Sequence, residues 1–78
     1  MDGVAQPFRL LEERPFDPPR AVEVEHDGFW WPGIQRSWRR CDDGRGWTAD
    51  VEWVVQHDWG PGKYAQSVFP DRVRLRDR

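Results

Sequence analysis

The chain has 78 residues, a net charge of −2 at pH 7 and a single cysteine. One cysteine excludes an internal disulfide, and Cys41 with the isolated His26 and His57 is too sparse a set for a zinc site, so we expect no metal and no cofactor. The negative net charge gives no bulk attraction to nucleic acid. Hydrophobic residues make up only 37% of the chain but aromatic residues 14%. A few large rings must therefore supply most of the core of one small domain.

Residues 1–19 contain four of the seven prolines and show no sustained periodicity. We interpret them as a Pro-rich arm, either disordered or laid along a domain that spans residues 20–78. The arm has no basic region followed by a long apolar run. We therefore expect neither a signal peptide nor a membrane anchor, and a cytoplasmic location.

The rest of the chain alternates strand and turn signals. Residues 20–26, "RAVEVEH", alternate apolar and charged side chains, and the Asp27-Gly28 pair that follows is a strong hairpin signal. A second strand is expected over residues 29–41, with a bulge or an edge position at Pro32-Gly33 because proline cannot donate to a central ladder. Further strands are expected over residues 47–57, 64–69 and 73–76. Five short antiparallel strands predict an all-β fold, a small and strongly bent SH3-like barrel with an N-terminal arm.

Three stretches of the sequence resemble a known group of domains. "DGFWWPGIQRSW" is similar to the second strand of Tudor domains, and its "FWWPG" to the motif of PWWP domains. "VEWVVQHDWGPG" resembles the Tudor third strand and turn, and "FPDRVRLRD" the closing helical turn and strand. Both groups belong to the Royal superfamily of SH3-like barrels. The excess of arginine over lysine, eleven to one, is typical of a GC-rich bacterial genome, so the chain resembles a small bacterial version.

The resemblance implies an aromatic cage that binds methylated lysine or arginine. The cage positions fall on Trp31, Trp53 and Trp59. The fourth position falls near Val24, which is not aromatic, and Phe29 is the candidate to replace it. A cation over an indole face gains roughly 0.5–2 kcal/mol. The alternative interpretation is that every ring belongs to the core.

Strand geometry separates two neighbouring tryptophans. Adjacent residues of a strand point to opposite sides, so Trp30 and Trp31 cannot both face the core. We expect Trp30 inward, with Ile34 and Trp38, and Trp31 outward. For Trp53 the alternation in its strand predicts a core position, whereas the resemblance predicts a cage position, and both interpretations stay open.

These observations favour a binding module that is not an enzyme. No motif brings Cys41, His57 or the serines together as a nucleophile with its base. The expected partner is a protein or peptide segment, with a cationic or methylated side chain as one candidate, and the expected state is a monomer with no membrane partner. One further hypothesis is that Phe8 or Phe16 of the arm occupies the aromatic site and inhibits it.

Two alternatives from other classes remain. Arginines interleaved with aromatic residues can bind nucleic acid through phosphate contacts and base stacking. The candidate residues for that function are Arg36, Arg39, Arg40 and Arg45. In the other alternative, the protein is a structural subunit whose exposed aromatic residues are buried by a partner.

Overall fold

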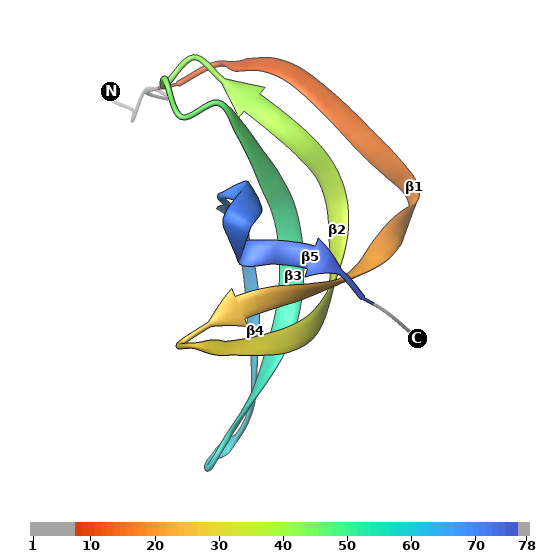
Figure 1. Cartoon of the computed structure of the whole chain (residues 1–78), viewed down its shortest axis with the longest axis vertical. Coiled ribbons are helices and arrows are strands. Elements are labelled where there is room, and N and C mark those ends of the chain that lie inside the picture. The colour runs from red at the N-terminus through yellow and green to blue at the C-terminus, as the bar shows by residue number, and fades with distance from the viewer. Residues whose placement is uncertain (1–7, 77–78) are drawn as a thin grey trace, which may run out of the picture.

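Five antiparallel strands form one strongly bent sheet in the order β4-β3-β2-β1-β5 (Figure 1). The computed structural model describes residues 8–76. The elements are β1 (Leu10–His26), β2 (Phe29–Cys41), β3 (Trp47–His57), β4 (Gly60–Val68), η1 (Pro70–Arg72) and β5 (Val73–Leu75). The expected all-β class with five antiparallel strands is confirmed. The barrel is not closed, because β4 and β5 are the two edges and no ladder joins them within the described residues.

The helical content of the described part is the three-residue η1. Residues 8–76 accordingly contain no helix of the length and apolarity needed to cross a membrane. η1 turns the chain back over the inside of the bend, so that β5 can pair with β1 from Val22 to Val24. The inner face of the sheet is thus partly covered by the chain's own C-terminal segment (Figure 1).

Strand β1 begins ten residues before the domain boundary that the sequence suggested. Residues 10–15 pair with the far end of β2, and pairing resumes at Arg20 opposite Gln35. Pro18 and Pro19 fall in the gap between these two ladders, where their missing N–H groups remove no ladder bond. Residues 10–19, expected as an arm, are therefore the first half of a bent strand, and residues 1–7 of that arm lie outside the described residues.

The two phenylalanines of this segment do not lie at the Asp27-Gly28 turn, where the expected aromatic site would be. Phe16 lies against the guanidinium of Arg20, 4.4 Å from its Cζ atom to the ring centre. Phe8 lies beside Cys41, at the opposite end of β1 from His26. The hypothesis that either ring occupies the site at the Asp27-Gly28 turn is wrong for this conformation, because the extended strand separates them.

The two hairpins β1–β2 and β3–β4 diverge at one end of the sheet. The β2–β3 ladder runs only from Gly33 to Arg40, so residues 29–32 pair with β1 alone and residues 54–57 with β4 alone. Pro32 lies just beyond that ladder and needs no bulge. Of the two alternatives expected at Pro32-Gly33, Pro32 therefore has the edge position, and the register shift of β2 against β3 lies between Gln35 and Ser37.

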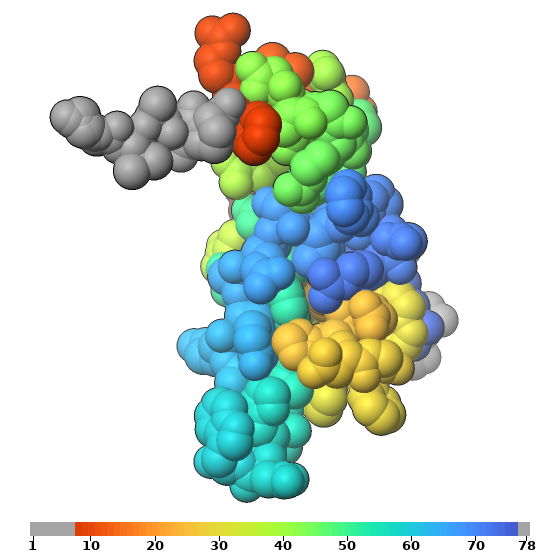
Figure 2. Space-filling view, turned by 90° about the vertical axis from the view of Figure 1, so that its left-hand side faces the viewer, coloured from red at the N-terminus to blue at the C-terminus, as the bar shows by residue number. Residues whose placement is uncertain are grey.

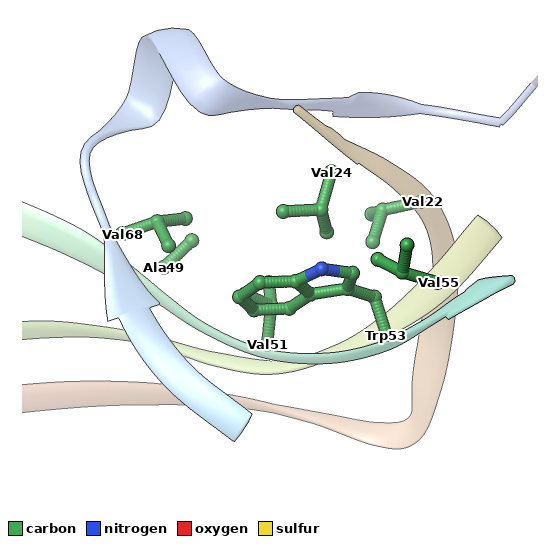
Figure 3. Close-up of a cluster of buried hydrophobic side chains, with 7 residues drawn as sticks. All are labelled: Val22, Val24, Ala49, Val51, Trp53, Val55 and Val68. Atoms are coloured by element: carbon green, nitrogen blue, oxygen red, sulfur yellow. The ribbon is translucent and has the colours of Figure 1, made fainter. Parts of the chain in front are cut away.

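A small cluster of side chains on the inner face forms the core (Figure 3). Apart from Trp53 its members are short: Val22, Val24, Ala49, Val51, Val55 and Val68. Trp53 is 2% exposed and is paired across the ladder with Gly33. A Cβ atom on Gly33 would collide with the carbonyl oxygen of Glu52 and lie 2.9 Å from the Cβ of Trp53. Glycine at this position therefore lets β2 lie directly against the strand that carries the buried indole.

We expect Gly33→Ala to lower the free energy of unfolding by about 1–3 kcal/mol, because the added methyl group overpacks a backbone contact that cannot move away cheaply. Urea denaturation of the two proteins measures the difference. If the urea midpoint and the slope of the unfolding free energy against urea were the same in both proteins, the close approach of β2 and β3 at this point would be contradicted.

Candidate functional site

Trp30 and Trp31 point to opposite faces of the sheet, as strand geometry requires, but the faces are the reverse of those expected. Trp31 packs against the buried cluster and donates its Nε1–H to the carbonyl of His26 at 3.2 Å. Trp30 lies on the outer face, with the guanidinium carbon of Arg74 4.0 Å from its ring centre. The expectation failed because the register shift after Gln35 changes the side on which later residues point. Trp38 therefore shares a face with Trp31 rather than with Trp30.

A cleft of about 280 Å³ lies between the diverging ends of the two hairpins. Both hairpin ends lie at the lower end of the molecule in Figure 2, one in gold and one in cyan. The β1–β2 end supplies His26, Asp27, Phe29 and Trp31, and the β3–β4 end supplies Val55, Gln56, His57 and Asp58. The rings of Phe29 and Trp31 meet edge to face, with 6.5 Å between their centres and 65° between their planes. We call this opening the hairpin cleft.

The four sequence-predicted binding residues divide into three groups. Phe29, which is 67% exposed, and the half-buried Trp31 both line the hairpin cleft. Trp59 is 74% exposed at the β3–β4 turn and reaches the cleft only through His57, on which it stacks at 4.6 Å. Trp53 lies in the core, as the alternation in its strand indicated. The structure thus brings Phe29 and Trp31 together, places Trp59 at the rim and leaves Trp53 underneath.

Two histidines connect the cleft to the core. Trp53 donates its Nε1–H to Nδ1 of His26 at 3.3 Å, so a neutral His26 carries its proton on Nε2, which lies 3.5 Å from Oδ2 of Asp27. Nε2 of His57 lies 3.0 Å from the Tyr64 hydroxyl, and the Tyr64 ring stacks on Trp53 at 5.4 Å. Each wall of the cleft is therefore tied to the same buried indole.

These two histidines were not among the site residues expected from the sequence. A signal was available, because the same dipeptide stands at both turns that border the cleft: His26-Asp27 before Gly28, and His57-Asp58 before Trp59. The repetition places one imidazole and one carboxylate at each of two strand ends. Only the pairing of the strands shows that those ends face one cleft.

The formal charges in the lining of the hairpin cleft are negative when the histidines are neutral. They belong to Asp27 and Asp58, one from each turn, and the lining includes no lysine or arginine. The carboxylate of Asp27 is 89% exposed, so it is available to a ligand. An opening with two aromatic rings and two carboxylates suits a cation better than an anion.

The four arginines of the nucleic-acid alternative each have a carboxylate partner. The nearest nitrogen–oxygen distances are 2.6 Å for Arg36–Glu52, 3.4 Å for Arg39–Glu13, 3.4 Å for Arg40–Glu12 and 3.7 Å for Arg45–Asp43. The hydrogen bond from Arg36 lowers the pKa of Glu52 below its ordinary 4.5. Arg36, Arg39 and Arg45 are therefore neutralised locally rather than gathered into one basic patch.

The structure does not bring the candidate nucleophiles Cys41 and Ser37 together with His57. Cys41 and His57 lie at opposite ends of the sheet, and the Ser37 hydroxyl donates to Glu13 at 3.1 Å. Within residues 8–76, no three His, Cys, Asp or Glu side chains come together as a metal site would require.

No protein-family model, curated protein or solved structure matches the chain.

The Arg36–Glu52 pair gives a pH prediction. Because the pKa of Glu52 is lowered in the folded state, its contribution to stability is present above the ordinary carboxylate pKa and disappears as the pH falls through the lowered value. Glu52→Gln should therefore be less stable than the wild type at neutral pH and equal to it in strong acid. Urea midpoints across this pH range measure the difference. In an Arg36→Gln background the pH-dependent effect of the same substitution should shrink, because only the weaker attraction of Lys63 for Glu52 remains, and an undiminished difference would contradict the assignment.

Proposed function

We propose that the protein is a non-catalytic binding module that receives a cationic side chain of a protein or peptide, such as a methylated lysine or arginine, in the hairpin cleft. The observation that carries the proposal is the lining itself, in which Phe29 and Trp31 stand beside Asp27 and Asp58 without a competing cation. The resemblance to Tudor and PWWP domains supports the same ligand class. In this proposal the chain is a small, open relative of the Royal barrels.

The chemistry requires no covalent step. Each ring face in contact with a cation stabilises the complex by roughly 0.5–2 kcal/mol, depending on how much water is excluded. The two carboxylates add long-range attraction, which raises the rate of encounter with a basic segment and weakens in salt. Glu23 and Glu25, on the neighbouring outer face, are ion-paired to Arg74 and Arg72, so Asp27 and Asp58 carry this attraction.

The aromatic residues have different roles in this proposal from those that the resemblance implied. Phe29 and Trp31 contact the ligand. The stacked pair of His57 and Trp59 forms the rim, where Gly62 leaves room because a Cβ there would lie 2.9 Å from the imidazole. Trp53 does not contact the ligand but donates its Nε1–H to Nδ1 of His26 and so orients that imidazole. A peptide backbone that follows the bound side chain would meet the exposed Trp59.

The proposal is tested with free Nε-trimethyllysine as the probe and unmodified lysine as the comparison, observed through the tryptophan indole N–H resonances in NMR titrations. Trimethyllysine should shift the Trp31 resonance and bind more tightly. Phe29→Ala should weaken binding several-fold, since one ring face is lost while the exposed side chain contributes little to folding. Asp27→Asn should weaken binding most at low salt.

Phe69→Ala is the matched control, because Phe69 is also exposed but lies outside the hairpin cleft. It should bind the probe as the wild type does. Equal binding by the Phe29→Ala and wild-type proteins would overturn the proposal. Absence of any indole shift at saturating probe would instead favour the structural-subunit alternative, in which a partner protein covers Phe29 and Trp59.

A further inference from the structure

A second cleft, of about 330 Å³, lies at the other end of the bend, between the inner face of the sheet and η1. It is lined by Arg14, Trp38, Trp47 and Pro70. The first two come from paired positions of β1 and β2, and Trp47 is paired with Arg40 of β2. These side chains therefore share one face, remote from both hairpin turns that form the hairpin cleft. We call it the upper cleft.

Guanidinium groups and aromatic rings alternate across this face. The Cζ atom of Arg14 lies 5.2 Å from the centre of the Trp47 ring, and that of Arg40 lies 5.8 Å from the same ring. Arg20 lies 5.8 Å from Trp38. Trp38 and Trp47 are only half buried. The rings therefore remain partly accessible beside cations that are already held close to them.

The charge balance of this face differs from that of the rest of the sheet. Arg14 and Arg40 share one carboxylate, Glu12, at 3.1 and 3.4 Å. Arg20 donates to the amide oxygen of Gln35 at 2.9 Å and has no carboxylate partner among the described residues. On the outer face, in contrast, Arg36 and Arg74 each have a glutamate of their own. Two guanidinium groups that share one carboxylate, and a third without one, leave a local excess of positive charge on this face of a chain whose net charge is −2.

We propose that the upper cleft binds a nucleotide unit of a single-stranded nucleic acid. A base would stack on Trp47 or Trp38, and the flanking phosphates would contact Arg14 and Arg40. Aromatic platforms beside surplus arginines are the combination that binds single strands without a sequence preference. The cleft volume lies at the low end of the range for small-ligand sites, which suits one ring system. This site is independent of the hairpin cleft.

The test uses a short fluorescein-labelled oligothymidylate and fluorescence anisotropy at a series of salt concentrations. The logarithm of the association constant should fall linearly with the logarithm of the salt concentration, with a slope of about −0.7 for each phosphate neutralised. Arg14→Gln should make that slope shallower by about 0.7. The Arg14 side chain is 69% exposed, so this variant should fold. Trp47→Leu should cost about fivefold or more in affinity, because a stacking platform is removed.

Arg36→Gln is the matched control, since it removes the same charge from the outer face. It should leave both affinity and salt slope nearly unchanged. Equal effects of Arg14→Gln and Arg36→Gln would overturn the proposal, as would an absence of binding at low salt. Competition by oligoglutamate as effective as that by unlabelled oligothymidylate would also overturn it, because it would show an anion site without base stacking. Phe29→Ala should not change oligonucleotide binding, which separates this result from the test of the hairpin cleft.

Discussion

The buried indole of Trp53 is the contact on which the rest of this small structure depends. The other members of the core are valines and one alanine, which cannot fill the inside of so strong a bend. Gly33 lies directly opposite Trp53 and lets the two central strands approach. The polar edge of the same indole faces outward to His26, and its face stacks on Tyr64. One residue thus links the packing of the core to the shape of the hairpin cleft.

The two ends of the bent sheet have opposite chemical character. At the hairpin end, two turns contribute a carboxylate each, and aromatic rings stand beside them without a cation. At the other end, tryptophans are bordered by arginines that outnumber their acidic partner. Both ends present accessible or half-buried aromatic rings, so the difference in the ligands that they favour comes from the charged neighbours and not from the rings. The two proposed sites follow from this separation of charge along one sheet.

Arginine also explains how so many aromatic residues coexist with a core this small. Trp30, Trp47 and Phe69 each have a guanidinium group about 4–6 Å from the ring centre. The planar cation covers part of an aromatic face and keeps its charge in water. A lysine ammonium, which has no planar face to stack, would cover these rings less well. The large excess of arginine in the composition therefore has a structural use in addition to any genomic cause.

The sequence by itself determined the all-β class, the approximate strands, the hairpin at Asp27-Gly28 and the opposition of Trp30 and Trp31, because these depend on alternation and turn chemistry that act over a few residues. The buried position of Trp53 could also be inferred from its strand. Only the tertiary structure decided that the sheet stays open, that residues 10–19 pair with β2, and that Trp31 rather than Trp30 packs on the core. A single register shift near Arg36 reverses the faces on either side of it, and the two His-Asp turns meet only because strands distant in sequence are paired. Such long-range pairing leaves no local pattern in the chain, so neither cleft could be assembled from the sequence.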